Sequence, residues 1–410
     1  MMHGAQGTIS SAAGTRETRL AVSLSGTNLA RAGDYNQRIV LQAIRLSGET
    51  TRVALARQTG LTAPTIANIT GRLMELGFVR LAGRRFGARG QPALRLTVDP
   101  DGAFALGLNI DRDHVTMVAL DLAGEVRSRV SREMTFALPE DVLAYVHDEI
   151  DGLIAVGGIK RDRVLGVGVA LPDDLGMIAL PHRPAGYERW SGLNVSDLLG
   201  EVLPWPVYAD NDAAAAALGE AQCATGFEHP SFFYLLISAG LGGGLVIDGS
   251  YYRGATLRSG EIGLMPDPAS SVPGARVQDT VSLSALGARL EAAGQSFSGR
   301  EDLLSETPLA MAVIDRWIED AARSLLSPLM AVNCLINPNA VLIGGRLPAP
   351  LLGRLAASLN ERLEGMALPS RAAVIPATMA GDAPAIGAAI LPFLDRLLPS
   401  DAILIQAGRD

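Results

Sequence analysis

The hydrophobic pattern near the N-terminus predicts three short helices. Apolar residues recur there at every third or fourth position, in three segments separated by glycine or polar turns. The segments are residues 35–48, 51–60 and 61–80. In the third, Thr62 is placed to cap the helix, and Pro64 fits the first turn because an N–H would be unpaired there anyway. Ile66, Ile69 and Leu73 form its apolar stripe.

Two apolar strands follow, and the segment between them is rich in arginine and glycine. The strands are expected at residues 78–81 and 93–98, with GRRFGARGQP between them. A helix-turn-helix followed by a basic hairpin is typical of a winged-helix DNA-binding domain, although a small structural helical bundle is the alternative. We assign the winged helix to residues 34–98 and a flexible arm, rich in serine, glycine and alanine, to residues 1–33.

From residue 99 onward, short apolar strands alternate with helical segments. Strands are expected at residues 103–110, 115–122, 164–171, 206–209, 232–238 and 340–343. Helices are expected at residues 140–155, 213–225, 282–293, 309–335 and 385–397. This alternation predicts an α/β fold, and glycine-rich turns in separate halves indicate two lobes with a cleft between them. We assign residues 99–410 to this effector domain.

The charge of the chain is unevenly distributed. Residues 1–100 carry 13 arginines against five acidic residues, whereas residues 101–410 carry 22 basic against 38 acidic residues. A basic first quarter on an acidic body fits DNA binding by the N-terminal domain alone, with a solvated basic segment as the alternative. The third helix would read bases in the major groove, and the hairpin arginines would contact phosphates or the minor groove. The candidate DNA-binding residues are Ala63, Pro64, Thr65, Asn68, Arg72, Arg84, Arg85 and Arg89.

Cysteine content and hydropathy exclude several classes of protein. Cys223 and Cys334 are the only cysteines, so we expect no disulfide framework, and no His/Cys cluster has zinc-ligand spacing. No apolar run has the length of a membrane span, and the first residues lack the apolar core of a secretory signal. We therefore expect a cytoplasmic protein that associates with the nucleoid by binding DNA.

Three further stretches resemble, in order, signatures of the ROK family (repressors, open reading frames and kinases). They are WSGLNVSDLLGEVLPWPVYADNDAAAAALGEA, ISAGLGGGLVIDGSYYRGATLRSGEIG and LINPNAVLIGG. The resemblance extends from about Asn36 to Leu397 and implies a bilobal, actin-like (ribonuclease H-like) sugar-kinase fold behind the winged helix. It also implies a sugar-responsive regulator, commonly a repressor, that binds operator DNA as a homodimer or homotetramer.

Four residues match positions that contact the sugar in ROK kinases. They are Asn211, Asp212, Glu261 and Asp279. The resemblance makes Asp212 the counterpart of the catalytic base, which takes the proton from the sugar hydroxyl. A helix cap is the alternative for Asn211 and Asp212, and a solvated loop acid is the alternative for Glu261.

The family's zinc ligands are missing from the matching positions of this chain. Leu264 stands where the resemblance implies a histidine that binds both sugar and zinc. Val277, Gln278 and Asp279 stand where the family has Cys-Leu-Glu. The resemblance therefore implies no zinc here, and a changed sugar specificity.

The first phosphate-binding turn of ROK kinases, Asp-x-Gly-Gly-Thr, is replaced by residues 109–113, which read NIDRD. At about 4 Å and an effective dielectric constant near 20, Asp111 and Asp113 would each repel a phosphate charge by roughly 4 kcal/mol, and Arg112 offsets only one of them. We expect no ATP cofactor and no catalysis, with Asp212 a vestigial base. The glycines of ISAGLGGG would then provide close packing and positive φ angles.

Two alternatives stay open at this point. One is a working ATP-dependent sugar kinase with a DNA-binding appendage, and the other is a DNA-binding scaffold that responds to no ligand.

Overall fold

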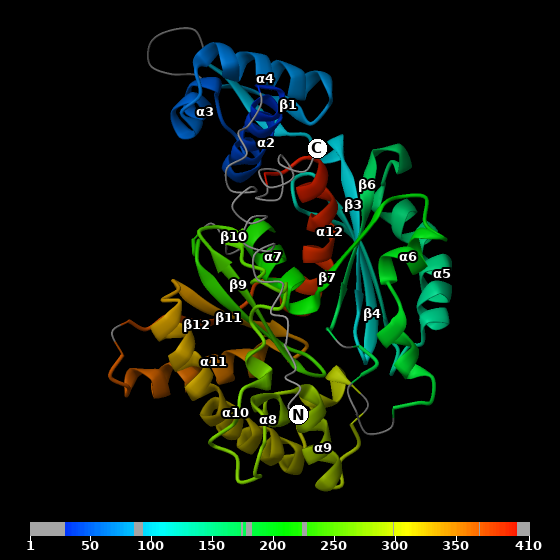
Figure 1. Ribbon diagram of the computed structural model, residues 1–410, viewed down its shortest axis with the longest axis vertical. Helices are drawn as coiled ribbons and strands as arrows, with labels where there is room; N and C mark the ends of the chain where they lie inside the picture. Colours follow the sequence, from blue (N-terminus) through cyan, green and yellow to red (C-terminus); the bar gives the residue numbers. More distant parts are fainter. Residues whose placement is uncertain are drawn as a thin grey trace, which may run out of the picture. The chain divides into compact units, whose positions relative to one another are not determined.

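The computed structural model describes residues 29–85, 93–173, 175–177, 183–223, 228–297, 299–368 and 370–399. The chain divides into two compact units (Figure 1). The first comprises residues 1–99 together with 394–410, and the second comprises residues 100–393.

The first unit holds a helix-turn-helix and a β-hairpin. Its elements are α2 (Leu29–Ser47), α3 (Arg52–Thr59), α4 (Ala63–Glu75), β1 (Val79–Arg85) and β2 (Ala93–Val98). The strands pair antiparallel, as a wing requires. Helix α2 begins at Leu29, so the last residues of the segment that we assigned to a flexible arm are helical. Leucine and alanine at this point favour helix, which explains the earlier start.

The capping residues of α3 and α4 follow the sequence prediction. The hydroxyl oxygen of Thr62 accepts a hydrogen bond from the backbone N–H of Thr65, and Gly60 ends α3 in the left-handed conformation with φ of 71°. The buried stripe of α4 differs by one residue, because Thr70 is fully buried in place of the half-buried Ile69. Thr70 tolerates burial because its hydroxyl donates to Ile66 O and accepts from Arg52 Nε.

The second unit contains two five-stranded sheets of matching design. In the first sheet the order is β5-β4-β3-β6-β7, and in the second it is β10-β9-β8-β11-β12. The first sheet consists of β3 (Phe104–Ile110), β4 (His114–Asp121), β5 (Val126–Glu133), β6 (Val164–Leu171) and β7 (Val207–Asn211). The second consists of β8 (Phe232–Ile237), β9 (Leu241–Ile247), β10 (Ser250–Tyr251), β11 (Ala340–Gly345) and β12 (Ala373–Pro376). Each sheet joins an antiparallel half to a parallel half, as the predicted two-lobed α/β fold requires.

Helices cover both sheets. They are α5 (Pro139–Gly157), α6 (Val195–Gly200), α7 (Asp212–Cys223), α8 (Val277–Thr280), α9 (Leu283–Ala292), α10 (Pro308–Leu335), α11 (Ala349–Glu364) and α12 (Ala383–Arg396). Helices α5 and α6 lie on one face of the first sheet and α12 on the other (Figure 1). Helices α10 and α11 pack with β8 and β11 in the largest core cluster. Among the described helices, none is both long enough and apolar enough to span a bilayer.

Glycines bring α12 unusually close to the elements beside it. A Cβ at Gly107 of β3 would lie 1.9 Å from Ala385 O, and a Cβ at Gly168 of β6 would lie 1.8 Å from Ala388 O. A Cβ at Gly387 would lie 1.6 Å from Ala215 O of α7. Because no side chain fits these gaps, α7 and α12 pack backbone to backbone and fix the position at which α7 begins.

Candidate functional site

Strand β7 runs directly into α7, and the junction carries two of the predicted sugar residues. The side-chain oxygen Oδ1 of Asn211 accepts hydrogen bonds from the backbone N–H groups of Ala213, at 2.9 Å, and Ala214, at 3.1 Å. Asn211 therefore caps α7, as the capping alternative predicted, and its Nδ2 amide takes no part in the cap. Asp212 Oδ1 accepts from Ala213 N at 2.8 Å.

Asp212 is buried at the start of α7, with only 7% of its surface exposed. Burial, followed by the charge of Asp111, raises its pKa to about 7, while the charge of Arg112 acts in the opposite direction. Near neutral pH this carboxyl therefore retains its proton far more often than an ordinary aspartate does. Such a group can accept a hydrogen bond from a hydroxyl or take up its proton.

The glycines of β9 bring this junction into contact with the second sheet. A Cβ at Gly242 would lie 2.8 Å from the Ala213 Cβ, and a Cβ at Gly244 would lie 2.6 Å from Ala213 O. The predicted close packing is confirmed. The predicted positive φ angles are wrong for Gly240, Gly242, Gly243 and Gly244, because the last three lie within β9 and Gly240 directly precedes it.

The same run holds the segment that carries Glu261. A Cβ at Gly243 would lie 2.4 Å from Gly260 O, immediately before Glu261. Glu261 is half-buried and precedes η5 (Ile262–Leu264), which contacts both β9 and α8. On α8, Asp279 is exposed, and its Oδ2 accepts a hydrogen bond from Arg276 N at 2.9 Å. The predicted sugar residues thus lie on neighbouring elements, and part of the Asp279 carboxylate serves as a helix cap.

The turn between β3 and β4 contains the residues that replace the phosphate motif. Asp111 N donates to His114 O, and Asp111 Oδ1 accepts from Arg112 N at 2.7 Å. His114 Nδ1 lies 2.7 Å from Asp113 Oδ1, and its Nε2 lies 3.1 Å from Asn109 Nδ2. None of these residues adopts a positive φ. The turn is therefore closed by its own side chains and needs no glycine.

A buried arginine from the second sheet completes this turn. Arg346 directly follows β11, and its Nη1 lies 3.0 Å from Asp113 Oδ2, while its Nη2 donates to Glu133 Oε1 at 2.5 Å. Burial acts to raise the pKa of Asp113, but the hydrogen bond and charge of His114 together with Arg346 outweigh it and lower that pKa. The turn is thus fixed to both sheets.

Other arginines also pair with acids across the two sheets. Nη2 of Arg253, after β10, lies 2.5 Å from Oδ2 of Asp210 on β7. Nε of Arg258 lies 3.3 Å from Oδ2 of Asp173, which follows β6. These ion pairs, like that of Arg346, run from arginines of the second sheet to acids of the first. We call them the inter-sheet ion pairs. They place positive charge from the second sheet against acidic side chains of the first sheet, in the region where Asp212 lies.

The side chains of the β3–β4 turn do not fit a nucleotide phosphate or a metal ion. A nucleotide phosphate at the β3–β4 turn would meet Asp111 and Asp113, with no glycine backbone to approach. Asp111, Asp113 and His114 have potential ligand atoms within 4.8 Å of one another, but Arg346 supplies positive charge beside Asp113, which disfavours a metal cation.

A hydrogen-bonded carboxylate stands in the segment that matches the family's zinc loop. Asp267 is buried and accepts hydrogen bonds from Thr280 Oγ1 at 3.0 Å, Ser324 Oγ at 2.6 Å and Ala269 N at 3.0 Å. Its contacts join the segment to α8 and α10. Leu264 is exposed and offers no ligand atom. These residues do not form a zinc site.

Most of the candidate DNA-binding residues lie on the outer face of α4. Ala63, Pro64, Asn68 and Arg72 are exposed, while Thr65 is half-buried, with its hydroxyl 2.8 Å from that of Thr62. Arg84 and Arg85 belong to β1, but their side chains and all of Arg89 lie outside the described residues.

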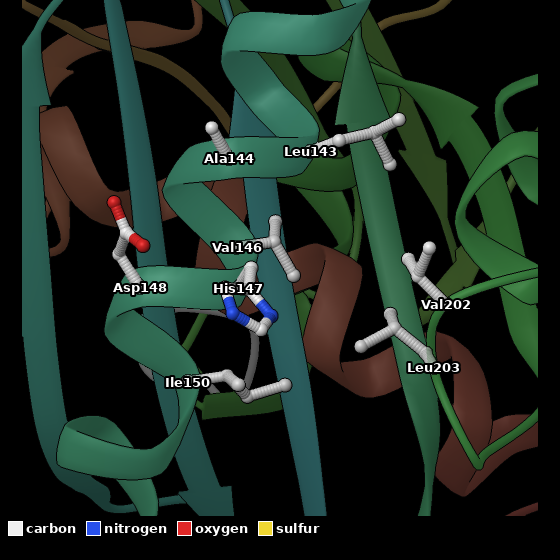
Figure 2. Close-up of a pocket in the computed structure, with 8 residues that line it drawn as sticks. All are labelled: Leu143, Ala144, Val146, His147, Asp148, Ile150, Val202 and Leu203. Atoms are coloured by element: carbon white, nitrogen blue, oxygen red, sulfur yellow. The ribbon is translucent and has the colours of Figure 1, made fainter.

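A surface pocket of about 370 Å³ lies elsewhere, along α5 (Figure 2). Figure 2 shows Leu143, Val146 and Ile150 of α5 on one side and Val202 and Leu203 on the other. None of the predicted sugar residues lines it. We therefore place the candidate site at the start of α7 and not in this pocket.

Sequence reasoning missed several residues of the site. Arg346, Asp173, Arg258 and Asp267 were not singled out, although Arg346 directly follows β11 and Arg258 lies within a recognised motif. The available signal was a charged residue next to an apolar run, as in LIGGR, where Arg346 directly follows the motif LINPNAVLIGG. Their pairing depends on contacts between distant segments.

Comparisons with known proteins agree on the family. The model of the ROK family matches residues 105–393. The uncharacterized protein y4fQ of Sinorhizobium fredii is 30% identical over 370 residues, which are 87% of this chain and 90% of that protein. The xylose repressor of Bacillus subtilis is 25% identical over 234 residues, 56% of this chain and 60% of the repressor.

Solved structures share the fold. A ROK family transcriptional regulator homologous to the Escherichia coli Mlc protein superposes with a TM-score of 0.65 at 20% identity, covering 93% of this chain and 100% of that one. A ROK family glucokinase from Streptomyces griseus, in complex with glucose and AMPPNP, gives 0.54 at 22% identity, covering 70% and 99%. The match to the family model and the similarity to y4fQ confirm the resemblance read from the sequence, and this chain belongs to the ROK family.

Proposed function

We propose that this chain is a sugar-responsive DNA-binding repressor whose kinase-like domain binds the sugar without phosphorylating it. The observation that carries the proposal is the contrast between two parts of one site. The sugar-side carboxylate Asp212 is kept and buried, whereas the phosphate-side turn is closed by Asp113, His114 and Arg346. The names of the xylose repressor and of the Mlc-like regulator support the same reading.

In this proposal the sugar lies at the start of α7. Asp212 accepts a hydrogen bond from a sugar hydroxyl, and the Asn211 amide donates one, because its oxygen already caps the helix. Glu261 and the remaining oxygen of Asp279 are the further acceptors. We assign no ATP, zinc or other cofactor.

The DNA side of the proposal rests on α4. Asn68 and Arg72, both exposed, are the residues that we expect to reach base edges in the major groove, with the wing arginines on phosphates. A homodimer or homotetramer would present two such helices to a palindromic operator. With about four arginines per protomer on phosphates, the logarithm of DNA affinity should fall with that of salt with a slope of about −7 for a dimer. A slope near −1 would rule out this interface.

Coupling between the two sites requires only that the sugar prefer one arrangement of the chain. A ligand shifts DNA affinity by the ratio of its affinities for the two arrangements. We propose that sugar binding favours the arrangement with lower operator affinity, so that the sugar relieves repression.

The test begins with duplexes selected from a random DNA library on the purified full-length protein. Fluorescence anisotropy then measures their affinity with and without each member of a panel of monosaccharides, amino sugars and sugar phosphates. At least one sugar should weaken binding, and Asp212→Asn should abolish that response. If DNA binding ignores every sugar, the alternative of a ligand-blind scaffold is favoured instead.

One observation favours a second function, that of a sugar kinase. The pKa of Asp212, raised to about 7 by burial and by Asp111, suits a general base at neutral pH. Coupled assays of ADP release across the same panel decide the matter. Sugar-dependent turnover that disappears in Asp212→Asn would replace the repressor-only reading with a kinase that also binds DNA.

A further inference from the structure

The side chain of Arg112 extends from the β3–β4 turn toward the second sheet. Only 8% of the residue is exposed. Its Nη1 lies 3.3 Å from the position that a Cβ at Gly240 would occupy. Gly240 directly precedes β9, and two residues further along Gly242 packs against Ala213, the neighbour of Asp212. The guanidinium therefore lies in the region where the two sheets and α7 meet.

Arg112 is electrostatically coupled to the carboxyl groups of this region. The groups that act on Asp212 are Asp111 and Asp173, which raise its pKa after burial itself, and Arg112, which lowers it. Asp173 has its own cation in Arg258. Arg112 is thus a cation that offsets the charge of Asp212, while Asp111 also acts on the buried Arg346.

The guanidinium of Arg112 differs from that of Arg346 in its hydrogen bonds. Arg346 donates to Glu133 and lies 3.0 Å from Asp113. Among the residues that the structure describes, Arg112 donates only its backbone N–H, to Asp111. A guanidinium carries five N–H donors, which can bind the oxygen atoms of a ligand. Oxygen atoms of a bound molecule would satisfy them.

We propose that Arg112 is a sugar-binding residue and that the ligand is a neutral sugar with neighbouring hydroxyl groups. One hydroxyl donates to Asp212 while the oxygen of its neighbour accepts from the Arg112 guanidinium. This inference rests on the proposed function, because it concerns the same site, and it adds a contact on the opposite side of the ligand.

The charge balance decides the class of sugar. Arg112 offsets the charge of Asp212, and Arg346, on which Asp111 also acts, is already paired with Asp113 and Glu133, so a phosphate ester or a sugar acid would add negative charge to an already acidic site. A neutral sugar adds none and uses the donors of Arg112 together with the acceptor of Asp212. We therefore expect free sugars to bind and their phosphates to be rejected.

The experiment is isothermal titration calorimetry on the full-length protein between pH 6 and pH 9. Wild-type protein is titrated with neutral monosaccharides and with the matching sugar phosphates and sugar acids. The best neutral ligand is then titrated into Arg112→Met, Arg112→Lys and Arg346→Met. Arg346→Met is the matched control, because it removes a buried arginine that already has carboxylate partners. Thermal melting of each variant checks that it is folded.

Arg112→Met should weaken binding about 10- to 100-fold, the usual effect of losing hydrogen bonds from a charged donor. It should also move the pH midpoint of binding upward, because Asp212 loses the charge that favours its ionised form. Arg112→Lys should keep the midpoint near that of wild type while still weakening binding. Arg346→Met should lower the melting temperature and leave the midpoint in place.

Each contrary result overturns a definite part of the reasoning. Wild-type affinity and an unchanged midpoint in Arg112→Met would show that Arg112 serves packing alone, while the proposed function would stand. Tighter binding of a sugar phosphate than of the free sugar would overturn the ligand class. A wild-type protein that binds none of these molecules would refute the proposed function and this inference together.

Discussion

Gly244 is the glycine of β9 at which a methyl group should do most harm to the site. In Gly244→Ala the new Cβ would lie 2.6 Å from Ala213 O and 2.6 Å from the Ala217 Cβ. Ordinary contacts begin near 3.4 Å, so β9 and the first turn of α7 would have to separate by about 0.8 Å. Neither atom belongs to a flexible side-chain end, and α12 packs against the other side of α7 at Gly387.

The structural cost should be moderate and the cost to binding larger. Overpacking of a tight core destabilises by about 1–3 kcal/mol. For a domain of this size, the melting temperature should fall by roughly 2–4 °C for each kcal/mol. The same displacement moves Asp212, and hydrogen bonds weaken quickly outside their narrow range of lengths. Loss of one such bond to a charged group would reduce sugar affinity by about tenfold or more.

Calorimetric titration with the best sugar and thermal melting measure the two effects on one protein sample. Gly353→Ala is the matched control, because Gly353 lies within α11 and no atom comes within 4 Å of its Cβ position. Replacing a helical glycine by alanine should add about 0.5–1 kcal/mol of stability and leave sugar affinity unchanged. Wild-type melting and affinity in Gly244→Ala would refute the view that this glycine run sets the position of Asp212.

Three further predictions concern charge and buried hydrogen bonds. Burial and Asp111 raise the pKa of Asp212 to about 7, so wild-type stability should fall as the pH rises from about 4 to about 7. Asp212→Asn should therefore melt higher than wild type at pH 8 and at the same temperature at pH 4. Plots of melting temperature against pH that run parallel for the two proteins would contradict this. Asp267→Ala leaves two buried hydroxyls without their acceptor and should lower the free energy of unfolding in urea by roughly 2–5 kcal/mol, against about 1 kcal/mol for Ser324→Ala. Equal losses in the two variants would disprove the role of Asp267. Arg346→Met should cost about 1–3 kcal/mol of stability at pH 7, and little of this comes from Glu133, which is 60% exposed. The lowered pKa of Asp113 adds stability above about pH 4 that is lost in acid. The variant should therefore lose less stability than wild type between pH 7 and pH 3 in urea unfolding.

The sequence was most informative where local chemistry determines the structure. Thr62 and Pro64 begin α4 as predicted, because capping and first-turn preferences depend on neighbouring residues alone. Strand β2 has the predicted bounds because apolar and polar residues alternate clearly. Strand β5 was missed because VRSRVSRE at the sheet edge is mostly polar. Strand β9 was missed because its glycines resemble a turn, although packing against α7 makes them strand.

The candidate site divides in the same way. Asn211 and Asp212 were identified from one contiguous motif, and their place at the start of α7 follows from it. The pairing of Arg346 with Asp113 joins residues more than 200 positions apart, and no periodicity in either segment encodes it. Charge pairs of this kind arise from tertiary contact, so a single sequence shows the two charged residues but not that they pair.

The loss of the phosphate motif and the presence of Arg346 depend on each other. Arg346 is buried, and restoring the family's threonine at Asp113 would remove one of its acceptors together with the partner of His114 Nδ1. A buried guanidinium left without carboxylates is strongly destabilising. Conversely, removing Arg346 alone would leave Asp113 without its cation. A return to nucleotide binding would therefore need changes at the turn and after β11 at once, and each single step would lower stability. The structure of the turn thus stabilises the non-catalytic state that we propose, and sensing is the function that remains open to Asp212.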